Sequence, residues 1–108
     1  MEKGMDTMKY ANMLGYSDVE PYEVVKVISD KTIEIRAMDS KALPWKRDFH
    51  PGGFFGHTSN QSEQKWDITS NEDNPVFRIR LGKKGWKNAG GSRFQLADEP
   101  RKFYDFNF

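Results

Sequence analysis

The chain contains no cysteine, no long apolar run and almost no excess charge. Without cysteine, disulfides, thiolate metal sites, iron–sulfur clusters and cysteine nucleophiles are excluded. No apolar stretch approaches the ~20 residues of a membrane-spanning helix or resembles the core of a signal peptide. We therefore expect no membrane partner and a cytoplasmic protein, in a bacterium or in a host cell. Aliphatic content is also low, since Leu, Ile, Val and Phe make up only 22 of the 108 residues.

Aromatic residues compensate for the missing aliphatics. They account for 14% of the chain, and the net charge of +1 does not fit the high charge of a disordered protein. The length is that of one domain. We expect a single domain over residues 1–108 with four parts. These are an N-terminal arm (1–21), a β-hairpin (22–38), an irregular loop (39–64), and a β-meander with an aromatic tail (65–108).

The hairpin carries the clearest β pattern in the sequence. Its second half alternates, with Ile33, Ile35 and Ala37 on one face and polar residues on the other. β-branched residues dominate both halves, and Asp30 and Lys31 separate them. Two such runs around a short polar turn predict two antiparallel strands.

Further strands are indicated towards the C-terminus. The cleanest alternation places Phe77, Ile79 and Leu81 on one face and Arg78 and Arg80 on the solvent face. Turn residues separate this run from its neighbours. We expect strands at 65–70, 76–81, 86–87 and 93–97.

Two segments are expected to lack strand structure. Asp6 is placed to cap a short helix over residues 7–14, with Gly15 as its stop, and so short a helix must dock to persist. Residues 39–64 show no sustained period and are interrupted by proline and glycine, which predicts a packed irregular loop. The fold class is thus mostly β: a small antiparallel barrel or sandwich with one N-terminal helix. We do not expect a Rossmann-type fold, because no alternation of helices and strands is visible in the sequence.

Charge is distributed unevenly along the chain. Residues 1–30 hold three lysines against six acidic residues, whereas residues 61–90 hold six basic residues against four acidic ones. A cluster of cations can displace counterions from nucleic-acid phosphates, and an exposed Trp86 beside it would stack on bases. The pI of 7.9 is below that of a dedicated nucleic-acid binder. A solvated sheet face and an acidic protein partner remain alternatives. The cluster comprises Arg78, Arg80, Lys83, Lys84, Lys87 and Arg93.

The irregular loop contains a second candidate surface. Trp45 and Arg47 pair a ring with a cation, and the run FHPGGFFGH at 49–57 places Phe54 and Phe55 among glycines. These rings either anchor the loop on the barrel or contact a partner. His50 and His57 lie in the same run, but their spacing matches no metal motif. We therefore expect no metal and no cofactor.

No catalytic constellation is visible. Ser59 and Ser62 lie near His57, but neither serine lies in a nucleophile elbow. The GKKG run at 82–85 lacks the spacing of a phosphate-binding loop. The last eight residues hold four rings, which predicts either a final strand or an exposed strip that binds a partner. We expect a protein that is not an enzyme.

Three runs resemble small uncharacterised proteins carried by bacteriophages and other bacterial mobile elements. They are YSDVEPYEVVKVISDKTIEIR at 16–36, FHPGGFFGH at 49–57 and EPRKFYDF at 99–106. The resemblance implies a small accessory protein, and such proteins are often binders, including inhibitors of host defence systems. It implies no functional residue.

These observations lead to a non-enzymatic interaction protein that binds a macromolecule. A protein is the first expectation for the partner. A nucleic-acid-binding barrel is the alternative, and a small metal-dependent enzyme is a minor one. Arginines beside aromatic rings are typical of interface hot spots. The predicted partner-binding residues are Trp45, Arg47, Phe54, Phe55, Arg78, Arg80, Lys83, Lys84, Trp86, Lys87 and Arg93.

Overall fold

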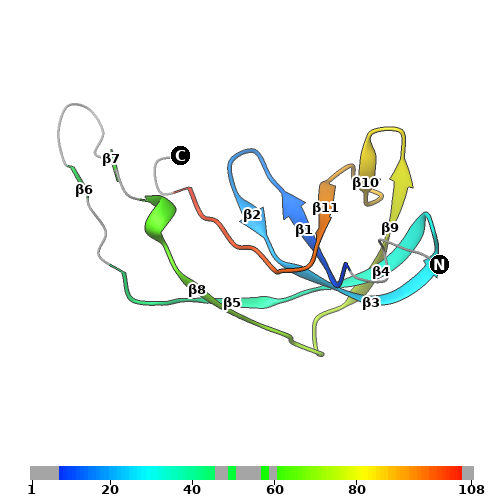
Figure 1. Ribbon diagram of the computed structural model, residues 1–108, viewed down its shortest axis with the longest axis horizontal. Coiled ribbons are helices and arrows are strands. Elements are labelled where there is room, and N and C mark those ends of the chain that lie inside the picture. The colour runs from blue at the N-terminus through cyan, green and yellow to red at the C-terminus, as the bar shows by residue number, and fades with distance from the viewer. Residues whose placement is uncertain (1–7, 46–48, 51–56, 59–60, 106–108) are drawn as a thin grey trace.

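The structure is a computed structural model that describes residues 8–45, 49–50, 57–58 and 61–105 (Figure 1). Strands dominate it, and a 3-10 turn, η2, is the helical element among these residues. The elements are β1 (Tyr10–Leu14), β2 (Val19–Glu20), β3 (Tyr22–Ser29), β4 (Thr32–Ala37), β5 (Asp39–Ala42), β6 (Phe49–His50), β7 (His57–Thr58), η2 (Gln61–Glu63), β8 (Trp66–Thr69), β9 (Val76–Gly82), β10 (Gly85–Lys87) and β11 (Arg93–Ala97).

Six antiparallel strands close into a barrel. Their order is β11-β10-β9-β4-β3-β1, and β1 pairs back onto β11. That closing pair runs in register from Tyr10 opposite Ala97 to Leu14 opposite Arg93. Closure pairs the edges that an open sheet would leave exposed. The predicted mostly-β fold and small antiparallel barrel are confirmed.

The barrel core follows from the two-residue period of its strands. Ile33, Ile35 and Ile79 are fully buried, and Ile33 is the register partner of Ile79. Trp86 and Phe94 extend the same cluster from β10 and β11. The hairpin predicted over 22–38 is confirmed as β3 and β4, which pair along their length. Irregularities in this pairing bend β3 as it wraps the core.

Aromatic rings fill the part of the barrel that aliphatics do not. The ring of Tyr22 meets Phe77 and Phe94 edge-on, at centroid distances of 5.6 and 5.3 Å. The Tyr22 hydroxyl donates to the Met13 sulfur at 3.9 Å. Burial, and secondarily the charge of Glu20, raises the pKa of Tyr22 above its usual 10.0, so this hydroxyl stays protonated.

The expected N-terminal helix is wrong over the residues that the structure describes. Tyr10–Leu14 form β1, which pairs with β11 on one side and with β2 and β3 on the other. Strand pairing on both sides satisfies the backbone of this segment. A helix of two turns is marginal alone, so tertiary pairing decides the conformation. The predicted cap, Asp6, lies outside the described residues.

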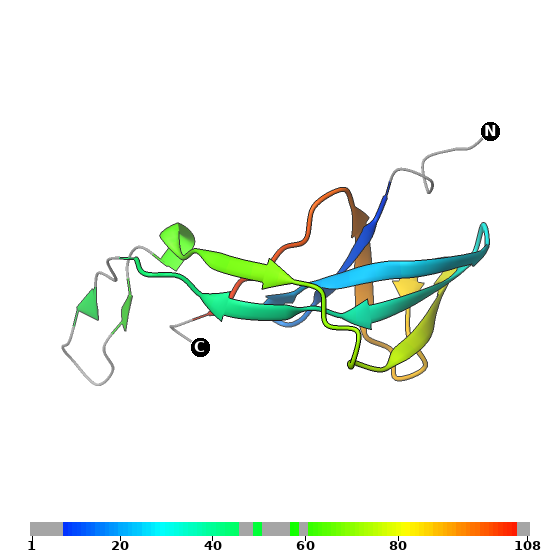
Figure 2. The same cartoon turned by 90° about the horizontal axis from the view of Figure 1, so that it is seen from below.

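A two-stranded ribbon formed by β5 and β8, which we call the arm from here on, extends from the barrel where an irregular loop was expected. β5 pairs with β8 from Asp39 opposite Thr69 to Ala42 opposite Trp66. These strands continue β4 and β9 outwards (Figure 2). Residues 39–64 thus contain β5, the β6–β7 pair and η2, so the expectation of an irregular segment is wrong for these parts. The arm makes the molecule long, at 53 × 27 × 26 Å.

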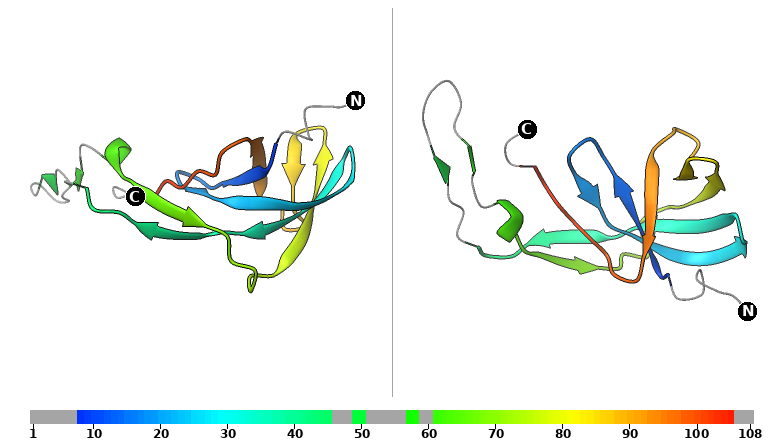
Figure 3. Two further views of the ribbon diagram at one scale, coloured as in Figure 1. Left: turned by 60° about the horizontal axis from the view of Figure 1, so that its bottom comes forward. Right: turned by 45° about the horizontal axis from the view of Figure 1, so that its top comes forward.

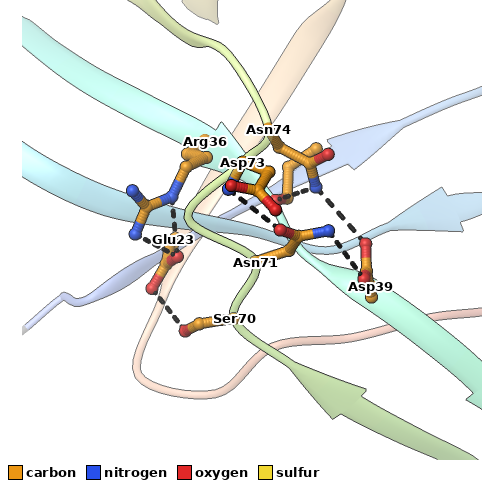
Figure 4. Close-up of polar contacts among 8 residues, drawn as sticks. Glu23, Arg36, Asp39, Ser70, Asn71, Asp73 and Asn74 are labelled. Atoms are coloured by element: carbon orange, nitrogen blue, oxygen red, sulfur yellow. Dashed lines mark hydrogen bonds and ion pairs between the residues drawn. The ribbon is translucent and has the colours of Figure 1, made fainter.

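A polar network fixes the junction between barrel and arm (Figure 4). Asn71 donates to Asp39 Oδ2 at 2.9 Å, and Asn74 donates to the Ala37 carbonyl at 2.9 Å. Nearby, Glu23 accepts two hydrogen bonds from Arg36 at 2.9 and 3.1 Å. The turn between β8 and β9 is thereby held against the point where β4 becomes β5.

A C-terminal strap, residues 99–105, crosses the barrel to reach the arm (Figures 1 and 3). Asn12 anchors its start: its side chain donates to the Glu99 carbonyl at 3.1 Å and accepts from the Arg101 N–H at 2.9 Å. Asn12 is 1% exposed, because the strap covers its outward side. Phe103 then forms a two-hydrogen-bond bridge with Val19.

The strap ends on the arm. Lys102 contacts both carboxylate oxygens of Glu20 at 2.7 and 2.8 Å and lies 5.3 Å from the centre of the Trp66 ring. Gln64 exchanges two hydrogen bonds of 2.9 Å with the Tyr104 backbone. The tail was expected to form a final strand or an exposed strip; through residue 105 it is docked by these hydrogen bonds and a single β-bridge. Its last three residues lie outside the described part.

Replacing Ile79 by Ala tests the core assignment. We expect the free energy of unfolding to fall by about 2–5 kcal/mol, because a fully buried aliphatic side chain leaves a cavity. Urea denaturation measures this. Val76→Ala, on the same strand but at a 46% exposed position, is the matched control and should cost far less. Equal losses at both positions would contradict the assigned core.

Replacing Asn12 by Ala tests the anchor of the strap. The Glu99 carbonyl and the Arg101 N–H lose their partner, so we expect a loss of about 1–3 kcal/mol in unfolding free energy. Hydrogen exchange at the Arg101 amide should quicken. Gln95→Ala, at the exposed register partner of Asn12, is the control. Unchanged protection of Arg101 in Asn12→Ala would show that the anchor lies elsewhere.

Candidate anion-binding site

Three cations form a row across adjacent barrel strands. Arg80 on β9 is the register partner of Lys87 on β10, and Lys87 is the register partner of Arg93 on β11. Side chains alternate between the two faces of a strand, so a residue next to an inward-pointing residue points outward. The buried neighbours are Ile79, Trp86 and Phe94. Arg80, Lys87 and Arg93 are therefore side by side on the outer surface, and we call them the cation row.

Two further cations occupy the tip of the β9–β10 hairpin. Gly82 and Gly85 are register partners, so Lys83 and Lys84 alone form the turn between them. Gly85 has a φ of +102°, a left-handed conformation that glycine adopts without strain. Both lysines are exposed. The cation row together with Lys83 and Lys84 is termed the cationic face.

An open hollow of about 770 Å³ lies on this face. Among the residues described by the structure, five of those lining it are cations and none is acidic. It also reaches the loop after β10, which Asn88 orders by accepting from the Ser92 N–H at 2.9 Å. The hollow is lined by Arg78, Arg80, Leu81, Gly82, Lys83, Lys84, Gly85, Lys87, Asn88 and Ala89.

One of the lining cations is neutralised. Arg78 donates to Glu34 Oε2 at 3.0 Å, and these two residues are register partners on β9 and β4. Within the part of the chain that the structure describes, no ion pair involves any member of the cationic face. Like charges directly opposite each other on a sheet are destabilising. The face is therefore an uncompensated concentration of positive charge.

A second hollow, of about 600 Å³, differs in character. It lies between β5, β8 and the strap, and its lining mixes both signs of charge. Glu20 and Lys102, which belong to it, already neutralise each other at 2.7 Å. Asp67 and Lys41 are opposite each other on β8 and β5. This hollow therefore lacks the single sign of charge that selects an anion.

Trp86 does not have the predicted role. It is 8% exposed and packs in the barrel core with Phe94 and Ile79. The expectation that its ring is available to stack on a base or to anchor a partner is wrong. The physical reason is alternation: Trp86 precedes Lys87, so an outward lysine requires an inward tryptophan.

The other predicted residues divide into two groups. Trp45 follows β5 in the chain, and β5 pairs with β8 rather than with the strands β9, β10 and β11 that carry the cationic face. Arg47, Phe54 and Phe55 lie outside the described residues. The structure thus unites the predicted basic residues but does not bring Trp45 to them. Sequence reasoning missed the lining role of Asn88, although an asparagine before two glycines and a serine signals an ordered turn.

The two histidines considered as metal ligands are His50 and His57. The β6–β7 pair makes His50 and His57 register partners. Among the residues that the structure describes, no group of three or more His, Asp or Glu residues is placed to hold a metal ion. In the same residues, no helix is long and apolar enough to cross a membrane.

Comparison with known proteins gives no relative. No protein-family model matches the chain, no curated protein matches it, and no solved structure matches it. The function is therefore argued from the cationic face itself.

Replacing Lys87 by Glu tests whether the cation row strains the fold. The change converts two like-charge pairs into two opposite-charge pairs, so we expect the unfolding free energy to rise by about 1 kcal/mol at low salt. Urea denaturation at low and at about 1 M salt measures the effect, which should shrink at high salt. Lys26→Glu, which sets a carboxylate opposite Glu34, is the control and should destabilise. A destabilised Lys87→Glu protein would contradict the account.

Proposed function

We propose that this protein is a non-enzymatic binding domain that holds an anionic macromolecular partner on its cationic face. The observation that carries the proposal is the cation row, in which Arg80, Lys87 and Arg93 are successive register partners without a carboxylate between them. Two turn lysines extend the same charge. The arrangement costs stability, and local costs of this kind are typical of functional sites.

The alternative explanation is a solvated sheet face with no partner. The neighbouring pairs of the same sheet argue against it. Arg78 is opposite Glu34, and Arg36 is opposite Glu23, with an ion pair in each case. Oppositely charged cross-strand pairs are thus the rule on β3, β4 and β9. The cation row departs from that rule.

The anionic partner belongs to one of two classes. An acidic protein surface is the first, including a component of a host defence system, as the resemblance to phage accessory proteins implies. Nucleic acid is the second. Both present the anionic groups that arginine and lysine bind through charge-assisted hydrogen bonds. A role in catalysis is not part of the proposal.

A capture experiment with matched variants tests the proposed function. The row variant is Arg80→Gln/Lys87→Gln/Arg93→Gln, and the control variant is Lys9→Gln/Lys26→Gln/Lys65→Gln, at three other exposed cations. Both variants remove three positive charges. Tagged proteins are incubated with bacterial lysate, with and without nuclease, and their folding is checked by circular dichroism.

We expect wild type and the control variant to retain the same bound material and the row variant to lose it. The reason is that the row holds neighbouring charges at fixed spacing, whereas the control lysines are dispersed: Lys26 lies on β3, Lys9 precedes β1 and Lys65 precedes β8. Retention of all bound material by a folded row variant would overturn the proposed site. So would equal loss from both variants, because net charge alone would then explain the binding.

A further inference from the structure

We infer that the partner of the cationic face is double-helical nucleic acid, held through its phosphodiester backbone without base stacking. The inference rests on the proposed function and specifies the partner's chemistry. It uses the cation row, the two turn lysines and the composition of the hollow between them.

The hollow lacks the anchors that protein interfaces use. Among the lining residues that the structure describes, Leu81 and Ala89 are the only ones with aliphatic side chains, and none is aromatic. The core of a protein interface is enriched in aromatic and other apolar side chains that fill pockets on the partner. Trp86, the ring closest in sequence, is committed to the barrel core. Phosphate recognition requires none of these groups, since charge and hydrogen bonds suffice.

The same composition favours a double helix over a single strand. Proteins that bind single strands combine a positive groove with aromatic side chains on which unpaired bases stack. With Trp86 buried, the described residues of the face offer no such platform. A duplex already stacks its own bases, so its backbone can be bound by cations alone.

The spacing of the cation row suits a densely charged backbone. Neighbouring strands lie about 4.8 Å apart, so three cations on adjacent strands span about 10 Å. Duplex DNA carries one charge per about 1.7 Å of its axis. A row of this length therefore has a phosphate within reach of each cation. Lys83 and Lys84 add two more contacts from the hairpin tip.

The low net charge of the chain does not oppose this binding. Glu20, Glu23 and Glu34 are each occupied by a cation of their own, Lys102, Arg36 and Arg78 respectively. At physiological ionic strength the screening length is about 8 Å, so acidic residues elsewhere on the molecule act weakly at the face. The local field is positive although the whole protein carries only +1.

Salt-dependent binding of labelled duplex DNA, followed by fluorescence anisotropy, tests the inference. Each phosphate contact contributes about −0.9 to the slope of log affinity against log salt. The row alone predicts a slope of about −2.7, and the two turn lysines steepen it to about −4.5. For the row alone, affinity falls about 40-fold between 50 and 200 mM salt.

The row and control variants described above complete the design. The row variant should lose about 2.7 from the magnitude of the slope, and the control variant should keep the wild-type slope. Duplex RNA should bind with a similar slope, and a single strand of the same sequence should bind more weakly than either duplex. Randomising the duplex sequence should leave the affinity unchanged, because backbone contacts do not read bases.

Four results would overturn the inference, and the last two separate its failure from the failure of the proposed function. A single strand that binds more tightly than duplex would indicate stacking. A slope that the row variant leaves unchanged would place the duplex elsewhere. In the third result, poly-glutamate binds the wild-type protein but not the row variant, and duplex does not bind either of them. The partner is then an acidic protein and the proposed function stands. If neither polyanion binds wild type, both proposals fail.

Discussion

Pairing between β1 and β11 closes the barrel, and the placement of every other group depends on that closure. The pair joins β1, the first described strand, to β11, the last described strand, along five residues in register. Once the sheet is closed, each strand must turn alternate residues into a narrow interior. Ile33, Ile79 and Phe94 take the inward positions and are buried together. The positions that remain on each strand are therefore directed outward.

The cation row is a consequence of the same alternation. On β9, β10 and β11 the inward residue is large and apolar, and the residue beside it is Arg80, Lys87 or Arg93. The register of the closed sheet then sets these three side by side. A shift of one residue in any of these pairings would bury a cation and expose a core residue. The core and the cationic face thus specify the same register.

The strap and the junction network serve a different purpose. Asn12 holds the start of the strap on the barrel, and Gln64 holds its end on the arm. Asp39 ties the β8–β9 turn to the start of β5. In the same half, Lys102 pairs with Glu20. Cations without an ion-pair partner among the described residues are concentrated on β9, β10 and β11, which is why we propose that side as the site for a partner.

The sequence allowed the hairpin, the β9 strand and the basic cluster to be predicted, because each is local. Alternation in residues 32–37 and 76–81 is visible without knowledge of the fold. The N-terminal strand was mistaken for a helix because its pairing partner, β11, is distant in the chain. The β5–β8 pair was missed because β5 is short and mostly polar, with its partner beyond a long insertion. Alternation buries Trp86 once Lys87 points outward, but which of the two residues points outward depends on the pairing of β10 with β9 and β11.

The central claim is that one face of the barrel, from β9 to β11, meets the partner while the arm and the strap do not. NMR titration of isotopically labelled protein with a short DNA duplex tests this claim most directly. The account predicts that amide shifts concentrate between Arg80 and Arg93, with the Lys83–Lys84 turn among the largest. Shifts concentrated on β5, β8 or the strap, with residues 80–93 unmoved, would contradict it.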